Sequence, residues 1–255
     1  MTKREILIAQ AIFYKGDWWE IVNSISRKEY VPYEMAEKLV SNLNCKTLTI
    51  LDEEYPSEWK RYYMPPLVLF YHGDISLILN DKNNLAVIGT RDPSDFGVKT
   101  TQELVSRLAK KYVIVSGLAR GVDGLSHQAA IENSGHTVAV LGSGINKCYP
   151  ISNKDIYSEI KERHLVISEY PGECEAKPSN FPLRNRLIAL FSKGILVTEA
   201  SLKSGTSITV KYGLFYGRDI MCVPSINLGN SGCNEFIRTG AYLVENAEQV
   251  EDIMD

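Results

Sequence analysis

The segment Leu85-Ala-Val-Ile-Gly-Thr-Arg91 carries the pattern that decides the fold. Four apolar residues predict a buried strand, and a turn that contains glycine and a charged residue follows at once. From residue 84 onward, such runs alternate with helical stretches six times, at residues 85–88, 113–115, 137–141, 165–167, 194–197 and 220–223. This alternation is typical of a parallel sheet covered by helices on both faces. We therefore predict an α/β fold with a doubly wound, mostly parallel sheet.

The residues before this sheet predict two further units. Three short helices are expected near residues 5–14, 17–26 and 32–43, with Asp17 as the cap of the second helix. Two extended segments, 48–51 and 67–71, flank a loop rich in aromatic residues and proline, and we expect them to brace the sheet. We divide the chain into a small helical domain, residues 1–45, and a sheet domain, residues 46–255, in which residues 46–83 form a connecting segment.

The charge of the chain limits the partners that it binds. A formal net charge of −3 excludes a surface coated in basic residues, so a nucleic-acid site has to be a local patch. The segment 177–218 supplies such a patch, because seven lysines and arginines stand there against Glu199 alone, a local charge of +6. The tail 245–255 holds only acidic charges and should face solvent or a protein partner.

Cysteine usage and hydropathy predict a soluble, cytoplasmic protein. The five cysteines form no CxxC pair and lie at no metal-binding spacing from histidine, which is expected of reduced thiols. The residues after Met1 form no signal peptide, and no apolar run of 18 residues occurs that could span a membrane. We therefore expect no membrane contact and no metal site.

The loops that follow the predicted strands are rich in small and basic residues. Ligands of doubly wound sheets bind beyond the carboxyl ends of the strands, so these loops are the expected binding region. Glycine and serine let backbone N–H groups approach an anion, and basic side chains can add charge. The residues that we expect at this phosphate-binding rim are Arg91, Ser116, Gly117, Arg120, Lys203 and Ser204. Tight turns alone also demand small residues, and that alternative stays open.

A further positive cluster opens the predicted helix at residues 180–192. Lys177 precedes the helix, whose apolar stripe is flanked on opposite sides by Arg184 and Arg186. A helix start carries free N–H groups and partial positive charge, so the cluster predicts an anion site. The alternative is that an arginine pairs with Glu169 or Glu199, at the ends of apolar strands. We expect one arginine to bind the ligand and the other to anchor the helix, and the sequence does not distinguish them.

Signatures of catalysis and of nucleotide cofactors are weak. The loop after the first strand of the sheet lacks G-x-G-x-x-G, and no G-x-x-x-x-G-K-[ST] motif occurs, so we expect neither NAD nor a cofactor of another kind. His127, at the start of a predicted helix, is expected to cap that helix or to lie on its surface, and a role as a general base is the alternative. No cysteine has a histidine neighbour in sequence that would activate it. We expect no enzymatic activity.

Six ordered motifs resemble the DprA/Smf family over about residues 46–244. They are Gly89-Thr-Arg91, Ser116-Gly-Leu-Ala-Arg-Gly-Val-Asp123, Tyr149-Pro-x-x-Asn153, Ser168-Glu-Tyr-Pro171, Phe181-Pro-Leu-Arg-Asn-Arg186 and Ser204-Gly-Thr206. The N-terminal helices resemble the small SAM-like domain of that family. The chain departs from the usual family pattern at Gly213 and at Pro224-Ser225, on the far rim of the sheet.

The resemblance implies an extended Rossmann-like domain and a cytoplasmic protein of bacterial natural transformation. Such a protein binds single-stranded DNA, protects incoming strands and helps to load the RecA recombinase. By motif position, Arg91, Lys177, Phe181, Arg184 and Arg186 match the residues expected in the basic DNA pocket, where Phe181 can stack on a base. The resemblance also implies a homodimer, and functions that rest on the C-terminal winged helix of some members are expected to be absent.

An enzyme on a similar sheet is the alternative function. A nucleotide-processing phosphoribohydrolase of the lysine-decarboxylase-like type would carry a Pro-Gly-Gly-x-Gly-Thr loop. The chain has Leu202-Lys-Ser-Gly-Thr206 at that place. We therefore favour the DNA-binding function.

Overall fold

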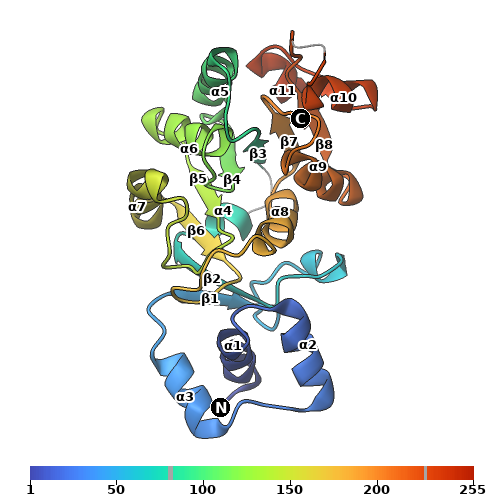
Figure 1. The fold of residues 1–255 in the computed structure, drawn as a ribbon. Coiled ribbons are helices and arrows are strands. Elements are labelled where there is room, and N and C mark those ends of the chain that lie inside the picture. The colour runs from blue at the N-terminus through green and yellow to red at the C-terminus, as the bar shows by residue number, and fades with distance from the viewer. Residues whose placement is uncertain (80–82, 227–228) are drawn as a thin grey trace.

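The computed structural model describes residues 1–79, 83–226 and 229–255 (Figure 1). Its N-terminal part is a module of three helices at one end of the molecule: α1 (Lys3–Phe13), α2 (Trp18–Arg27) and α3 (Tyr33–Ser41). Asp17 caps α2 by accepting hydrogen bonds from the backbone N–H groups of Trp19 and Glu20, as the sequence predicts. The three expected helices are confirmed with ends shifted by one or two residues.

The sheet has nine strands among the described residues, in the order β1-β2-β6-β5-β4-β3-β7-β8-β9. Strands β3 to β9 pair in parallel, while β1 and β2 add an antiparallel pair at the edge beside β6. This confirms the predicted α/β fold, and β1 and β2 come from the segment that was expected to brace the sheet. The strand bounds are Lys46–Thr49, Val68–Gly73, Asn84–Ile88, Val113–Ser116, Thr137–Val140, Leu165–Ser168, Gly194–Val197, Asp219–Cys222 and Tyr242–Leu243.

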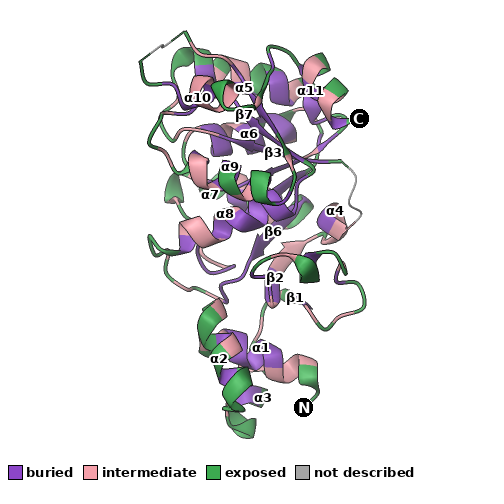
Figure 2. Cartoon of the chain, turned by 90° about the vertical axis from the view of Figure 1, so that its right-hand side faces the viewer, coloured by how far each residue is buried: buried purple, intermediate pink, exposed green. Residues whose placement is uncertain are grey.

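Apolar side chains project from both faces of the central strands, so helices cover both faces of the sheet. On β3, Leu85 and Val87 pack with α5 (Asp95–Leu108), α6 (Val122–Glu132) and α11 (Ala247–Met254). Ala86 and Ile88 face the other layer, which holds α8 (Asn180–Leu190) and α9 (Thr206–Phe215). Strands β3 to β7 are almost wholly buried between these layers (Figure 2). The remaining helical elements are α4 (Ser76–Leu79), α7 (Lys154–Arg163), α10 (Gly232–Arg238) and two short 3-10 turns, 59–61 and 151–153.

The strand order creates a crevice beside β3. The chain runs from β3 through β4 and β5 to β6 on one side, then crosses back to place β7 on the opposite side of β3. The loops that leave β3 and β7 therefore turn away from each other at the carboxyl edge of the sheet. Ligands of doubly wound folds bind at such a point.

The helical module packs against the antiparallel edge of the sheet. Leu7, Ile8 and Ala11 of α1 share one apolar cluster with Phe70 of β2 and Val166 of β6. The indole nitrogen of Trp18 also donates a 2.8 Å hydrogen bond to the carbonyl of Pro65. No helix in the described part of the chain is both long and apolar enough to cross a membrane.

Candidate nucleic-acid interface

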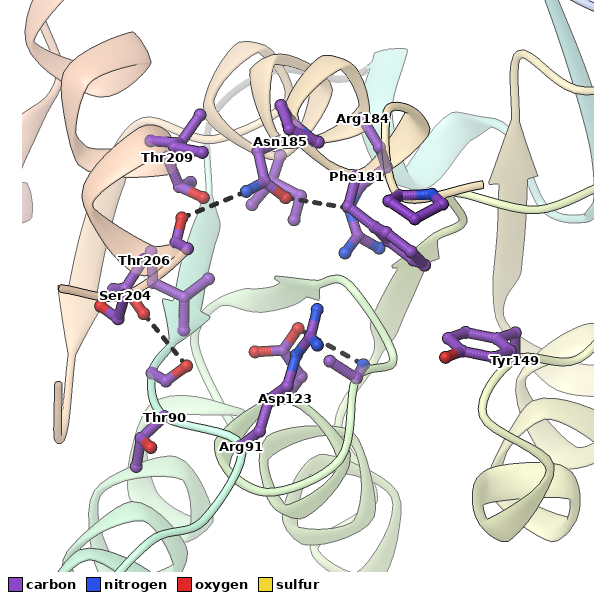
Figure 3. A pocket seen from close by; sticks show the side chains of 18 residues that line it. Thr90, Arg91, Asp123, Tyr149, Phe181, Arg184, Asn185, Ser204, Thr206 and Thr209 are labelled. Carbon is purple, nitrogen blue, oxygen red and sulfur yellow. Dashed lines mark hydrogen bonds between the residues drawn. The ribbon is translucent and has the colours of Figure 1, made fainter. Parts of the chain in front are cut away.

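A cavity of about 570 Å³ opens at the carboxyl edge of the sheet, beside the first turns of α8 and α9 (Figure 3). Its walls come from the loops after β3, β4, β5 and β7, so it occupies the crevice created by the strand order. Its volume falls within the range of about 300–1,000 Å³ that is usual for small-ligand sites. Arg91, Phe181, Arg184 and Ser204, all expected from the sequence, lie together in its lining.

Phe181 forms an aromatic wall of the cavity. Its ring centroid lies 5.7 Å from that of Tyr149, whose side chain is 49% exposed. The guanidinium carbons of Arg91 and Arg184 lie 5.7 and 5.8 Å from the same ring centroid, which is cation–π distance. Gly142 lies against the ring, because a Cβ there would come within 2.8 Å of it. The site therefore combines a fixed aromatic surface with two positive charges.

Arg91 is the exposed charge of the cavity. It follows β3 directly, as the sequence predicts, and its side chain reaches the mouth of the cavity (Figure 3). Within the described residues it makes no ion pair, so its charge is available to a ligand. An exposed guanidinium beside an aromatic ring suits a phosphate that joins stacked bases.

Arg184 is the buried charge of the cavity. Only 4% of the residue is exposed, and its Nη1 donates hydrogen bonds of 2.6 Å to the carbonyls of Gly117 and Val140. Its Nε donates to the side-chain oxygen of Asn185. The pKa of Arg184 is lowered to about 10, mainly by burial; the nearby Arg91 also lowers it, and Asp123 opposes the shift. Because this pKa lies well above 7, the guanidinium stays charged at neutral pH. The strand-end carbonyls thus hold a permanent positive charge at the cavity floor.

Asp123 places a carboxylate beside that charge. The residue is 7% exposed, and its Oδ2 accepts hydrogen bonds from the backbone N–H groups of Gly117 and Ala119 at 3.2 and 3.4 Å. Burial raises the pKa of Asp123, whereas Arg184 and these two donors oppose the shift. The loop after β4 therefore fixes the orientation of the carboxylate.

The far wall is polar and uncharged. Ser204 precedes α9, and Thr206 and Thr209 lie at its start. Asn185 of α8 donates a 3.3 Å hydrogen bond to the carbonyl of Gly205. Thr206 donates a 3.1 Å hydrogen bond to the carbonyl of Gly89, which ties this wall to the loop after β3. The two sides of the crevice are thereby linked.

Arg186 is the arginine that anchors the helix. Its Nη1 and Nη2 donate bidentate hydrogen bonds of 2.6 Å to the Glu169 carboxylate, and only 1% of the residue is exposed. Burial alone would lower the pKa of Arg186, but Glu169 more than offsets this and raises it. Nε also donates to the carbonyl of Met64, in the connecting segment. The structure thus shows which arginine pairs with Glu169: Arg186 holds α8 against β6, and it lies outside this cavity.

The remaining expected site residues are dispersed. Ser116 is fully buried, and its hydroxyl donates to the carbonyl of Val87, a structural role. Lys177 lies in a second cavity, of about 610 Å³, between α8 and the helical module. Arg120 is exposed and pairs with Asp92 at 2.5 Å. Lys203 is exposed next to Ser204, while Glu199 accepts from Ser94 and not from an arginine.

The prediction for His127 was wrong. His127 is fully buried in α6, and its Nδ1 lies 2.6 Å from the hydroxyl of Thr137, so it neither caps the helix nor lies on its surface. Burial lowers the pKa of His127 to about 3, with smaller contributions in the same direction from Arg184 and His164. The sequence shows that His127 lies four residues after Asp123, but it does not show that this face of α6 packs against Thr137 of β5.

Several polar residues of the site were not predicted. Tyr149, Asn185, Asp123 and Thr206 belong to the quoted motifs, but no role was assigned to them from the sequence, and Thr209 lies outside those motifs. The sequence offered only positional signals of a binding role: Asp123 and Tyr149 follow predicted strands, and Asn185 lies between the two arginines. Among the residues that the structure describes, no group of three or more His, Cys, Asp or Glu side chains is arranged to hold a metal ion.

Comparison with known proteins identifies relatives of this chain and its fold. A family model described as DNA recombination-mediator protein A matches residues 46–255. The DNA processing protein DprA of Streptococcus pneumoniae is 40% identical over 207 residues, covering 80% of this chain and 72% of that protein.

Two solved structures agree with these matches. The X-ray structure of DprA from Streptococcus pneumoniae superposes with a TM-score of 0.79 at 32% identity, and covers 98% of this chain and 94% of that one. A structure of DNA processing protein A from Helicobacter pylori, described in terms of its single-stranded DNA binding mode, has a TM-score of 0.73 at 28% identity. The match covers 83% of this chain and 96% of that one.

Proposed function

This chain belongs to the DNA recombination-mediator protein A family, and from that membership we propose that it is a recombination mediator that binds single-stranded DNA in natural transformation. The strand occupies the cavity at the carboxyl edge of the sheet. Arg91 contacts the phosphates, and Phe181 offers a stacking surface to a base. In this function the protein protects incoming strands and helps to load the RecA recombinase.

The observation that carries the proposal is the pairing of Phe181 with Arg91 and Arg184. The ring can stack on a base, and the two guanidinium groups within 6 Å of it can attract a phosphate. These are the two interactions through which proteins bind single strands. In a duplex the base faces are covered by their neighbours, so Phe181 would have no base face to contact. The arrangement therefore favours a single strand over a duplex.

Exposed apolar side chains in the C-terminal half suggest where protein partners bind. Leu214 and Phe215 on α9 are 63% and 67% exposed, and Tyr242 and Leu243 of β9 are 51% and 48% exposed. Large apolar side chains at this exposure are typical of interaction sites when they are contiguous. They are candidates for the RecA contact and for the homodimer that family membership suggests.

The phosphoribohydrolase alternative is not favoured by the family match. Incubation with nucleoside monophosphates tests it directly, since a hydrolase releases the free base. We expect no release above the rate of a sample without protein.

Fluorescence anisotropy with a labelled single-stranded oligonucleotide tests the DNA-binding function. Phe181→Ala should weaken binding by about 1–3 kcal/mol, because one stacked base loses its platform. Phe13→Ala is the matched control and should retain the affinity, because Phe13 lies on α1 and is 45% exposed, outside the cavity lining. A duplex of the same sequence should compete poorly. Equal competition by the duplex, or full affinity in Phe181→Ala, would contradict the proposal.

A further inference from the structure

Arg91, the exposed charge of the cavity, is carried by the short loop that joins β3 to α5, residues 89–94. Its side chain points from this loop into the cavity (Figure 3). An exposed guanidinium on a freely moving loop would lose conformational freedom when it binds a phosphate, and that loss weakens the affinity. The contribution of Arg91 therefore depends on how firmly the rest of the molecule holds this loop.

Glu199, two residues after the end of β7, holds both ends of that loop. Its backbone carbonyl accepts a 2.8 Å hydrogen bond from the N–H group of Thr90. Its side-chain Oε2 accepts hydrogen bonds of 3.0 Å from both the backbone N–H group and the hydroxyl of Ser94. Arg91 lies between these two points, so a single residue spans the segment that carries the binding charge.

The carboxylate of Glu199 has a fixed place at the start of α5. Ser94 is the N-cap of that helix, and its hydroxyl also accepts from the backbone N–H group of Gly97. Gly97 leaves room for the carboxylate, because a Cβ at this position would overlap with Oε2 of Glu199. Negative charge at a helix N-terminus is also stabilised by the helix dipole. Glu199 lies outside the cavity lining, so it makes no direct contact with a ligand there.

The first half of the loop has a second attachment, on the side of α6. The carbonyl of Thr90 accepts a 3.1 Å hydrogen bond from the first N–H group of that helix, and the carbonyl of Arg91 accepts one of 3.3 Å from Nε of Arg120. The second half, which ends at Ser94, is attached through the carboxylate of Glu199. Removing that carboxylate therefore loosens the loop at one end and leaves the other end in place.

We propose that Glu199 is a positioning residue for DNA binding: its carboxylate fixes the loop, so that Arg91 meets a phosphate without first having to be ordered. This inference rests on the proposed function and adds a residue whose charge is opposite to that of a phosphate-binding group. A carboxylate repels a nearby phosphate chain, so charge alone predicts that removing the Glu199 side chain strengthens binding. Positioning predicts the reverse.

Anisotropy titrations with a labelled single-stranded oligonucleotide separate the two effects. Glu199→Ala should weaken binding roughly 2- to 12-fold, the cost of immobilising one flexible side chain on association. Glu199→Gln should stay close to the wild type, since its side-chain oxygen can still accept both hydrogen bonds from Ser94. The slope of log K against log salt concentration should be that of the wild type in both variants, because Arg91 remains to contact its phosphate.

A double variant shows whether the effect passes through Arg91. In the Arg91→Ala background, Glu199→Ala should cause no further loss of affinity, because the charge that Glu199 positions is already gone. Asp52→Ala is the matched control for a lost carboxylate. Asp52 accepts hydrogen bonds from Arg4 and Thr49 beside β1, outside the cavity lining, so its removal should lower Tm without lowering the affinity.

The outcomes separate the two proposals. A wild-type chain that binds no single-stranded DNA overturns the proposed function and this inference with it. Binding by the wild type, with equal or tighter binding by Glu199→Ala, overturns the inference alone, and so does an equal loss in Glu199→Ala with and without Arg91. If Glu199→Ala does not fold, Gly97→Ala displaces the same carboxylate and should show the same loss of affinity. Unchanged affinity in Gly97→Ala would then overturn the inference.

Discussion

Replacing Arg186 tests whether this arginine anchors α8 and leaves DNA binding to other residues. Arg186→Met keeps much of the length of the side chain but removes the guanidinium that pairs with Glu169 through two 2.6 Å hydrogen bonds. The Glu169 residue is 8% exposed, so its carboxylate would remain buried without a partner. We expect the variant to lose stability while single-stranded DNA affinity changes little, because Arg186 lies outside the cavity lining.

The magnitude follows from the burial of the pair. Breaking a buried ion pair by removing one partner costs about 3–5 kcal/mol. In a domain of this size, 1 kcal/mol shifts the melting temperature by about 2–4 °C, so Tm should fall by about 6–20 °C. The double variant Arg186→Met, Glu169→Met removes both charges and should recover most of that loss, since apolar replacements of a buried pair are often neutral or stabilising.

Thermal unfolding followed by circular dichroism measures the stability, and anisotropy with a labelled oligonucleotide measures the affinity. Arg91→Ala serves as the control with the reverse pattern: its DNA binding should weaken, and its Tm should not change because Arg91 is exposed. A variant Arg186→Met that melts like the wild type but binds DNA poorly would refute the assignment. Failure of the double variant to recover stability would show that the loss does not come from the unpaired carboxylate.

Two further predictions concern residues beneath the site. A Cβ at Gly117 would lie 2.6 Å from the guanidinium carbon of Arg184, so Gly117→Ala should displace that charge. The affinity for single-stranded DNA should then fall about 10-fold or more in the same titration. Unchanged affinity would mean that Arg184 does not contribute to binding. His127 has a pKa of about 3 in the folded protein and about 6.5 in the unfolded chain. As the pH falls from 6.5 toward 3, only the unfolded chain binds a proton at His127, so the free energy of unfolding decreases over this range and is unaffected by His127 above it. Urea unfolding at pH 7 and pH 5 should show a loss of about 2 kcal/mol that is absent in His127→Asn, and equal losses in both proteins would exclude this origin.

The sheet was predictable from the sequence because its strands are buried on both faces. Each apolar run marked a strand to within one or two residues, and the alternation of strands and helices indicated parallel pairing. The order of the strands came only from the structure. The position of the site followed as well, since strand ends meet at one edge. Arg91 and Ser204 could therefore be placed at the cavity before the fold was known.

The internal order of the site was not predictable, because it depends on contacts between distant segments. Arg184 and Arg186 leave α8 on opposite sides, but only the tertiary structure shows which one meets Glu169 and which one meets the carbonyl of Gly117. The start of α8 gives a second example. Ser179 makes no side-chain capping bond, and Asn180 donates instead to the carbonyl of Gly142, after β5.

The salt dependence of binding tests most directly whether the strand lies in this cavity. If the phosphates of a single strand contact Arg91 and its basic neighbours, log K falls linearly with log salt concentration, by about 0.7 for each contact. We predict that Arg91→Ala binds more weakly than the wild type and has a slope smaller in magnitude by about 0.7. An Arg91→Ala protein with the affinity and slope of the wild type would place the DNA elsewhere and contradict the account.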